Sequence, residues 1–488
     1  MSLTQIESKN RDSGIEPPEG RSVTEELSGI DSSMHSERSG ASTLSLRRLS
    51  RALAGSLFRS LLAVIIGSLI LRLAAQSTGQ MLQFYFAEIH QNHFTISNAL
   101  TGLITASFFL SELAGSPVLG ALSDRYGRKF FMISGSLLGL LAVQITSMTV
   151  AIWLLVLTRL LAGLSTASAI PAILGYISEG TSGRPRLRAR VVGLFEITLV
   201  GGIALGNVVG GYLWKFFGSP ATIAGVHLIS PAFSLNGVIY IASLAIFIWG
   251  VRDLRRRRRS SRVEITETKF KHYRAVLKSP RVWRFVPAWV AIFCIVGMWT
   301  NTSVRLFTGK DHYAGQLLTG NIAPEKFGNV SAILAVIFAG GVLAWSFFLS
   351  RYRKTSVMLL ATSGLFTTLL AVYGLNHPGS LASIIYYPLI GILSLSLLVL
   401  SGFTPAALTY LADVTEAYRE DRGSIMGLYS VFLGVGQLIG TSVGGYFADW
   451  GGLDGLLLLS AIFGLITTFS LLALRKHESL VVKPRSVS

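Results

Sequence analysis

The stretch GALSDRYGRK, residues 120–129, places four charged side chains within ten residues of a chain that is 51% hydrophobic and only 14% charged. Apolar runs flank it on both sides, at 97–119 and at 130–148. A helix of roughly 20 apolar residues is long enough to cross about 30 Å of hydrocarbon. The stretch therefore has the character of a short polar loop between two membrane helices.

Twelve such apolar runs cover most of the 488 residues. In lipid only helices and closed barrels satisfy their own backbone hydrogen bonds, and runs of this length favour helices. The fold class predicted is an all-α membrane protein. The runs lie at 61–86, 97–119, 130–148, 151–177, 191–216, 232–250, 286–307, 327–349, 355–375, 380–410, 424–447 and 452–474.

The net charge of +18 is concentrated in alternate loops. Starting with the N-terminal arm, every second connection carries arginine or lysine, including the run RRRRRSSR at 255–262. Three of the loops between them, AEIHQNHFT, YGLNHPGS and DWGGLDG, contain neither residue, and the richest of the intervening loops carries only Lys310 and Lys326. By the positive-inside rule both termini and the middle loop are expected to be cytoplasmic. The basic run is then a loop that faces lipid head groups, and no nucleic-acid partner is expected.

These patterns divide the chain into five parts. They are a disordered cytoplasmic arm (1–55), an N-terminal six-helix bundle (56–250), a basic cytoplasmic linker (251–285), a C-terminal six-helix bundle (286–475) and a cytoplasmic tail (476–488). The arm is rich in Ser, Glu and Gly and lacks the apolar core of a signal peptide. We expect a monomeric protein of the cell (plasma or inner) membrane.

Enzymatic signatures are missing from the sequence. Cys294 is the only cysteine, and there is no HExxH, no Walker-type GxxxxGK[ST] and no His/Cys cluster. GTSVG at 440–444 has the spacing of a nucleophile elbow, but it lies within an apolar run. We therefore expect no enzyme, no metal site and no cofactor.

An internal repeat relates the two halves. A shift of 234 residues aligns 171–213 with 405–447 without a gap and gives fifteen identities in 43 positions. PAILGYISEGT matches PAALTYLADVT, and LVGGIALGNVVGGYL matches LGVGQLIGTSVGGYF. Two related six-helix bundles that face each other are the arrangement with which secondary transporters achieve alternating access.

Through these features, residues from about 55 to 475 resemble the major facilitator superfamily. GALSDRYGRK is similar to the family's signature between its second and third spans. The resemblance implies two pseudo-symmetric six-helix bundles that transport a small-molecule substrate. Arg159 and Gly163 in TRLLAGLST resemble the family's Arg-containing motif associated with proton coupling. GNVVGG resembles the GPxxGG core of the antiporter motif, with Asn207 where the family has proline.

Charged residues at the cytoplasmic ends of the spans are candidates for an inner gate between the two bundles. Carboxylates can pair with guanidinium groups or with helix N-termini. The alternative is that they are solvated residues that set the topology, each pair contributing about 0 to 1 kcal/mol. The candidates are Asp124, Arg125, Arg128, Lys129, Glu179, Arg188, Asp413 and Arg422.

Four ionisable residues lie inside apolar runs of the N-terminal half, where such groups are costly and usually functional. They are Arg72, Glu112, Arg159 and Glu196. We expect proton coupling by these residues, with H+ as the coupling ion. Glu112 or Glu196 would hold a proton while closed off from water and release it when exposed to water or to an arginine. A purely structural pair of Arg72 with Glu112 is the alternative.

The first span carries a polar stripe whose members are spaced four, four and three residues apart and therefore lie on one helix face. They are Arg72, Gln76, Gln80 and Gln83. The resemblance implies that spans one, four, seven and ten line the substrate cavity. The cavity candidates are Gln76, Gln80, Gln83, Thr166, Trp299, Asn301, Tyr386 and Tyr387, with an aromatic belt as the alternative for the tryptophan and tyrosines. Close helix packing is expected at Gly202, Gly206, Gly210, Gly436, Gly440 and Gly444, which recur every four residues.

We therefore expect a proton-coupled secondary transporter of small organic molecules. The span-four motif and GNVVGG favour export, whereas YISE (176–179) and Arg188 resemble sugar-type porters and favour import. A receptor or scaffold that retains the fold without transporting is the alternative from another class.

Overall fold

The computed structural model describes residues 25–223, 225–253, 280–349, 351–379, 382–415 and 422–481. It has two compact units, Met1–Phe58 and Arg59–Ser488. Within the first unit the structure begins with helix α1 at Glu25, where a disordered arm was expected. The segment TLSLRRLSRALAGSLF (43–58) is rich in Leu, Ala and Arg, whose helix propensity is high. Most of the expected linker (254–279) and tail (482–488) lies outside the described residues.

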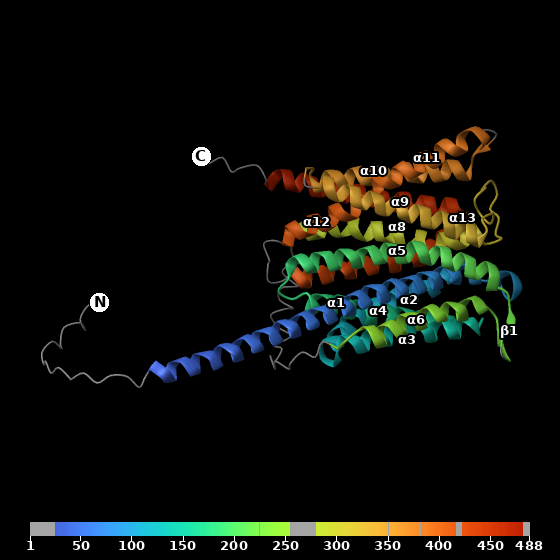
Figure 1. Cartoon of the computed structure of the whole chain (residues 1–488). Helices are drawn as coiled ribbons and strands as arrows, with labels where there is room; N and C mark the ends of the chain where they lie inside the picture. Colours follow the sequence, from blue (N-terminus) through green and yellow to red (C-terminus); the bar gives the residue numbers. More distant parts are fainter. Residues whose placement is uncertain are drawn as a thin grey trace, which may run out of the picture. The chain divides into compact units, whose positions relative to one another are not determined.

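The second unit is almost entirely helical (Figure 1). A short antiparallel hairpin pairs Ala221 with Leu228 and turns at Gly225, where φ is 80°. The elements are α1 Glu25–Asn92, α2 Asn98–Tyr126, α3 Arg128–Ser147, α4 Ile152–Gly180, α5 Pro185–Phe217, β1 Ala221–Ile223, β2 Val226–Leu228, α6 Pro231–Gly250, α8 Pro280–Thr308, α9 Pro324–Phe348, α10 Lys354–Asn376, α11 Ala382–Leu400, α12 Phe403–Thr415 and α13 Arg422–Val481.

Eleven helical segments of the described chain are long and apolar enough to cross a membrane. The last of them, Val431–Lys476, contains two helices that meet at Gly451 and Gly452, the latter with φ of 60°. This junction lies where the loop DWGGLDG was expected between the last two runs. The described part of the chain therefore accommodates the twelve expected spans.

The tenth expected span, 380–410, is not one continuous helix. Helix α11 ends at Leu400 and α12 begins at Phe403. Pro405 lacks the backbone N–H that would bond to the Ser401 carbonyl, which weakens a continuous helix at this point. The indole of Trp345 donates to the Leu398 carbonyl at 2.9 Å, so a carbonyl next to the break has a partner.

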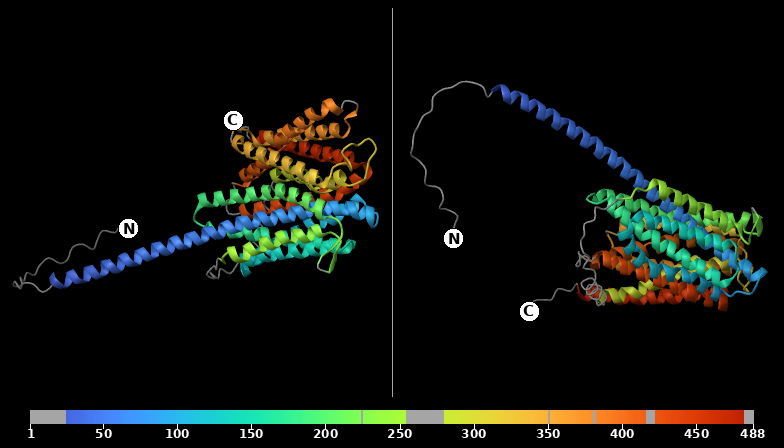
Figure 2. Two further views of the ribbon diagram at one scale, coloured as in Figure 1. Left: turned by 45° about the vertical axis from the view of Figure 1, so that its right-hand side comes forward. Right: turned by 90° about the horizontal axis from the view of Figure 1, so that it is seen from below.

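The helices of this unit form an N-terminal bundle, α1 (from Arg59) to α6, and a C-terminal bundle, α8 to α13 (Figures 1 and 2). The most extensive contacts between them are α2 against α13 and α5 against α9, and α2 also contacts α8. Tyr85 and Phe233 are buried in the first bundle, and Trp289 and Phe403 in the second. We call the end that carries residues 120–129 the inner end, following the charge pattern, and the opposite end the outer end.

Candidate functional site

Arg128 organises the charged residues at the inner end. It begins α3 directly after Gly127, whose φ of 106° turns the chain between α2 and α3. Its guanidinium forms an ion pair with Asp124, donates to Ser123 Oγ at 2.7 Å and lies 3.3 Å from Glu179 Oε1. The side chain of Arg128 is only 15% exposed. These contacts join α2, α3 and α4 within the N-terminal bundle.

The other inner-end candidates contact helix ends and loops. Lys129 Nζ donates to the Ile248 carbonyl at 2.6 Å, next to the end of α6. Arg188 donates to the Ser178 carbonyl at 3.0 Å and to Thr181 Oγ1 at 3.3 Å, so it caps the end of α4. Arg125 is exposed. The side chains of Asp413 and Arg422 lie outside those that the structure describes.

The intramembrane charges fall into two groups. Arg72 in α1 is within electrostatic reach of both Glu112 in α2 and Glu196 in α5. Arg159 in α4, only 3% exposed, lies instead beside Tyr240 of α6. Its Nε and one terminal nitrogen have no hydrogen-bond partner among the described residues. Arg72 therefore has both predicted carboxylates within electrostatic reach, and Arg159 lies elsewhere in the same bundle.

The glutamine stripe of α1 lies against other helices. Gln76 donates to Asn207 Oδ1 of α5 at 2.9 Å, and Gln83 donates to Thr105 Oγ1 of α2 at 3.0 Å. Gln80 is 3% exposed and lies next to Gly328 of α9. Asn207, at the position where the antiporter motif has proline, thus uses its side chain to hold α1 and α5 together.

The aromatic and polar candidates of the C-terminal bundle have different surroundings. Trp299 Nε1 donates to Ser460 Oγ at 2.9 Å, which ties α8 to the second half of α13. Asn301 donates to the Gly297 carbonyl at 2.8 Å and lies 3.5 Å from Thr441 Oγ1. Tyr386 is 40% exposed and packs edge-on against Tyr387. In α4, Thr166 donates to the Ala162 carbonyl of its own helix.

Both predicted glycine rows lie where two helices approach closely. A Cβ added to Gly202 or Gly206 would lie 2.6 Å from Arg72 Cβ or 2.7 Å from Gln76 Cβ, so α5 packs onto α1 here. At Gly210 the nearest atom would be the Ser77 carbonyl oxygen at 3.1 Å. In the other bundle Gly436, Gly440 and Gly444 pack α13 in the same way against α8.

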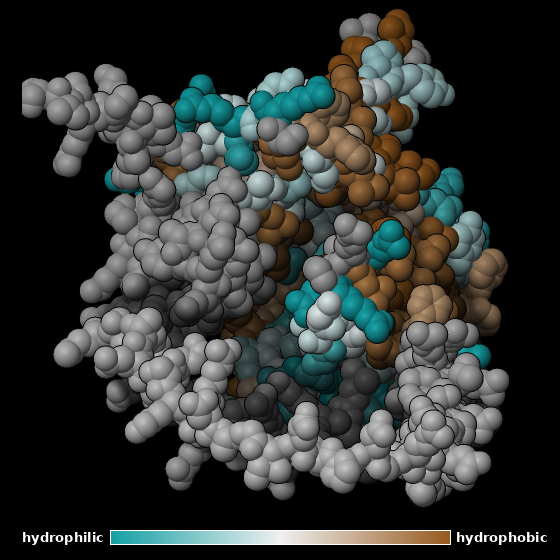
Figure 3. Space-filling view, turned by 60° about the vertical axis from the view of Figure 1, so that its left-hand side comes forward, coloured by the Kyte–Doolittle hydropathy of each residue, from teal (hydrophilic) through white to brown (hydrophobic). Residues whose placement is uncertain are grey.

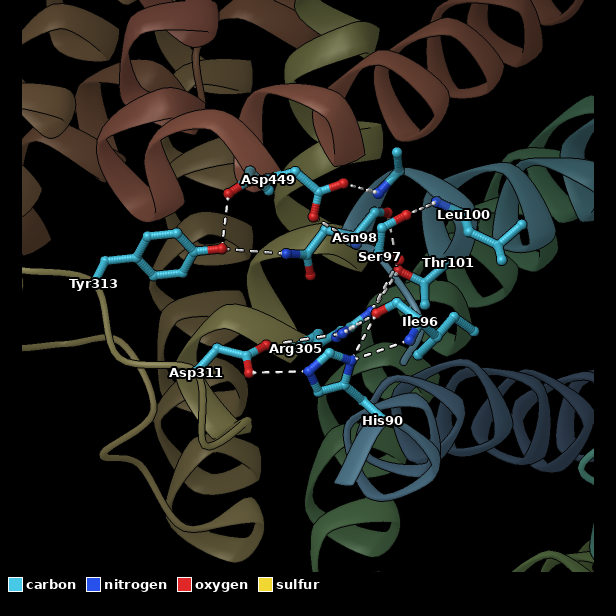
Figure 4. A network of polar contacts seen from close by, with 12 residues as sticks. His90, Ile96, Ser97, Asn98, Leu100, Thr101, Arg305, Asp311, Tyr313 and Asp449 are labelled. Carbon is cyan, nitrogen blue, oxygen red and sulfur yellow. Dashed lines mark hydrogen bonds and ion pairs between the residues drawn. The ribbon is translucent and has the colours of Figure 1, made fainter. Parts of the chain in front are cut away.

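At the outer end an arginine joins the two bundles (Figure 4). Arg305 of α8 is 2% exposed and donates to the carbonyls of Ile96 at 2.7 Å and Ser97 at 3.1 Å. It also donates to Thr101 Oγ1 at 3.2 Å and lies 3.7 Å from Asp311 Oδ2. The segment between α1 and α2 is thereby held from the opposite bundle.

Asp449, near the Gly451–Gly452 junction of α13, caps the beginning of α2. Its two carboxylate oxygens accept from the backbone N–H of Asn98 at 2.7 Å and of Ala99 at 2.8 Å. Tyr313 donates to the Ala448 carbonyl at 3.0 Å and accepts from Asn98. Burial, followed by the nearby Asp311 and Asp449 carboxylates, raises the pKa of Tyr313, so its phenol stays a neutral donor.

The inner end differs from the outer end. The hydrogen bonds and ion pairs that the structure describes between the two bundles lie toward the outer end. Figure 3 brings the inner end forward and shows a hollow in this face, with hydrophobic side chains beside it and hydrophilic ones at its rim. Among the described residues the bundles are therefore joined by polar contacts on the outer side.

Comparison with known proteins decides the family. A sequence profile described as Major Facilitator Superfamily matches residues 52–399 and 320–487. The chain belongs to the major facilitator superfamily. It is an integral membrane protein of the bilayer that transports a small-molecule substrate, and it is not an enzyme.

Relatives within the major facilitator superfamily include drug-resistance proteins. Multidrug resistance protein 1 of Bacillus subtilis (strain 168) is 23% identical over 365 residues, which is 73% of this chain and 83% of that protein. The class C tetracycline resistance protein of Escherichia coli is 32% identical over 141 residues, 28% of this chain and 35% of that protein.

Solved structures show the same fold. The nucleoside transporter NupG superposes with a TM-score of 0.63 at 15% identity, covering 85% of this chain and 99% of that one. A bacterial homologue of the human lysosomal transporter Spinster, inward-facing and unoccupied, gives 0.61 at 16% identity over 87% and 95% of the two chains.

The outer-end network was missed in the sequence. Arg305 lies at the end of the run 286–307 and is not among the four predicted intramembrane charges. Asp449 lies in DWGGLDG, a loop for which the sequence predicts only its side of the membrane, from its lack of Lys and Arg. Counting the charged residues in each loop cannot identify these two residues, because most of their partners are backbone groups of the opposite bundle.

Proposed function

We propose that this chain is a proton-coupled secondary transporter that exports small organic molecules by alternating access. The cluster of Arg72, Glu112 and Glu196 is the observation that carries the proposal. It supplies two carboxylates and one guanidinium inside membrane helices, so one negative charge is left without a cation. Such a group in lipid is costly unless it is neutralised.

The excess carboxylate suggests a coupling step. While the site is shut off from water, a proton on Glu112 or Glu196 neutralises the cluster, and Arg72 pairs with the other carboxylate. When the bundles rock and water reaches the site, hydration stabilises the ionised form and the proton leaves. Proton release is thereby coupled to the step in which the site opens to water. Arg72 remains next to an ionised carboxylate in both states.

The relatives support export. Proteins named for multidrug and tetracycline resistance match this chain, and we propose that it likewise moves small organic molecules out of the cell. We further propose a monomer in the plasma or inner membrane with both termini in the cytoplasm. Import of a polar nutrient is the second candidate, favoured by the YISE and Arg188 elements of the sequence.

Transport in proteoliposomes with an imposed pH gradient tests the coupling. Uptake of a panel of dyes, drugs and sugars is measured with the gradient in either direction, which also separates export from import. We expect gradient-dependent movement in the wild type and its loss in Glu112→Gln, Glu196→Gln or both. Glu88→Gln, a half-buried carboxylate near the outer end of α1, is the control and should retain it. Full activity and pH dependence in both cluster variants would rule out this mechanism.

A further inference from the structure

A histidine at the outer end of α1 faces an acidic residue of the opposite bundle (Figure 4). His90 lies in the last turn of α1, and its Nε2 is 3.6 Å from Asp311 Oδ1. Asp311 belongs to the loop 309–323, which joins α8 to α9 in the C-terminal bundle. The two side chains are 27% and 34% exposed, so water reaches the pair while the outer end is closed.

The loop that carries Asp311 is attached to the C-terminal bundle. The N–H of Gly320 donates to a carbonyl of α8 at 2.8 Å, and that of Leu317 donates to the Asn376 carbonyl at the end of α10 at 2.9 Å. His90, in contrast, belongs to α1 of the N-terminal bundle. The distance between His90 and Asp311 therefore depends on how far apart the two bundles are at this end.

The other ring nitrogen of His90 has two partners and can use only one of them at a time. Nδ1 lies 3.1 Å from the Ile96 backbone nitrogen and 2.9 Å from the Ile96 carbonyl oxygen. A neutral ring with its proton on Nε2 accepts the N–H, whereas a protonated ring donates to the carbonyl. Ile96 lies in the same bundle as His90, so this exchange is available whether the outer end is open or closed. What closure adds is the charge of the opposite bundle.

The charged groups that the C-terminal bundle brings to this network have a net negative charge. Asp311 and Asp449 both act electrostatically on Arg305, which lies 3.7 Å from Asp311. Two carboxylates thus face one guanidinium, and the phenol of Tyr313 is a neutral donor. On closure this net charge attracts a protonated His90 and has no comparable effect on a neutral one.

Other charged groups near the end of α1 compensate one another. Glu88 in α1 is within electrostatic reach of Lys310 and His93. Its carboxylate and the lysine ammonium group have opposite charges, and His93 is exposed to solvent. Among the described residues, the one ion pair of His90 is that with Asp311. This pair therefore dominates the effect of charging His90.

We propose that His90 is a sensor of the outer pH that favours the closed outer end when the outer medium is acidic. Histidine changes its charge between about pH 5 and 8. Protonation of His90 and closure favour each other, so closure is favoured at the acidic end of this range and loses that advantage as the pH rises. Acid outside then limits the access of outer protons to the Arg72 cluster. The inference rests on the proposed alternating access and orientation.

Spin–spin distances measured over a range of pH test the sensor. Val226→Cys of β2 and Ile384→Cys of α11 provide exposed label sites, one on each bundle, in a Cys294→Ser background. Glu112→Gln and Glu196→Gln are added, so that neither carboxylate of the proposed coupling site titrates. From about pH 5 to about pH 8 we expect the ratio of closed to open populations in this parent protein to fall about threefold, as for a part-exposed ion pair.

Two substitutions of His90 hold its charge fixed. His90→Gln is always neutral and should give, at every pH, the distance distribution that the parent has at the alkaline end. His90→Lys is charged throughout and should give the distribution of the acidic end at every pH. Asp311→Asn removes the partner and should abolish the pH dependence while the histidine ring remains.

Two other histidines of the outer end are matched controls. His377→Gln removes a ring whose Nε2 lies 2.9 Å from Asp454 Oδ2, a pair within the C-terminal bundle. His93→Gln removes an exposed ring three residues from His90. Both variants should retain the pH dependence of the parent.

Unchanged pH dependence in folded His90→Gln would overturn the proposal, as would an equal loss in either control or a closed population that grows as the pH rises. So would one common distribution in the parent, His90→Gln and His90→Lys at every pH. The measurement involves neither a substrate nor a pH gradient, and the coupling carboxylates do not titrate in it. Failure of proton coupling in proteoliposomes would therefore leave the sensor standing, and failure of the sensor would leave coupling standing.

Discussion

Arg128 shows how one side chain can serve several helices at once. It pairs with Asp124 and Glu179 and donates to Ser123, and Gly175 of α4 leaves the space that its guanidinium occupies. A largely buried arginine needs partners for most of its donors, and three helices supply them. The role that the structure describes for Asp124 and Arg128 is to hold the inner end of one bundle together. A gate that closes against the other bundle stays a prediction.

Asn207 supports a prediction at the same scale. Replacing it with leucine leaves the Gln76 amide without its partner at 2.9 Å in a part-buried site. We expect a loss of about 1–3 kcal/mol of stability, because a polar group is left unsatisfied. Thermal unfolding in detergent should show a melting temperature lower by several degrees, on the order of 2–4 °C for each kcal/mol.

The double variant is the control for this prediction. When Gln76 and Asn207 are both replaced by leucine, no polar group is stranded, and most of the stability should return. Additive losses in the double variant would show that the two amides do not stabilise the protein through each other.

At the scale of elements, the same packing joins α5 to α1 and α13 to α8. Glycines four residues apart leave a groove along one helix face, and the backbone of the neighbouring helix fills it. In lipid there is little hydrophobic gain from bringing two apolar helices together, so close packing has to supply the attraction. The repeat carries this groove in both halves, through Gly206 and its counterpart Gly440.

Gly440→Ala tests the groove. The added Cβ would overlap the carbonyl oxygen of Cys294, a backbone atom that cannot rotate away. We expect about 1–3 kcal/mol of destabilisation from overpacking, measured by thermal unfolding. Gly340→Ala in α9 is the matched control, because nothing lies within 4 Å of its added Cβ, and it should be neutral or slightly stabilising. Equal effects of the two would contradict close packing at Gly440.

At the scale of the whole molecule, the repeat allows one set of contacts to be made twice. Each bundle offers the start of its second span, α2 or α9, to the fifth span of the other. With two such contacts between them, the bundles can rock against each other while each bundle moves as a rigid body. The charges differ between the halves, so the two contacts need not be equally strong.

Deletion of residues 1–45 tests whether the helical unit from Arg59 onward transports by itself. It removes more than half of the separate first unit, Met1–Phe58, and none of the second. We expect transport in proteoliposomes to survive within about twofold, because the Arg72 cluster and the outer contacts all lie in the second unit. Complete loss of transport in a correctly inserted protein would instead favour the scaffold alternative.

Much of the fold could be predicted from local patterns. Hydrophobic length predicts spans because each membrane helix satisfies its own backbone and must match the bilayer whatever its neighbours are. The break between α11 and α12 was missed, since Pro171 lies inside a continuous α4 at the position that aligns with Pro405. Whether a proline interrupts a helix depends on the partners that the surrounding structure offers to the backbone near the break, as the Trp345 indole does for the Leu398 carbonyl.

The sequence by itself determined the membrane class, the two related bundles, the glycine rows and the family resemblance, because these depend on composition, periodicity and internal repetition. Only the tertiary structure decided that Arg72 lies within electrostatic reach of Glu112 and Glu196 while Arg159 lies apart, and that Asp449 and Arg305 hold the start of α2. Those contacts join residues up to 351 positions apart, and several end on backbone groups. Backbone N–H and carbonyl groups are chemically alike along the chain, so no sequence pattern predicts which of them a side chain will bind.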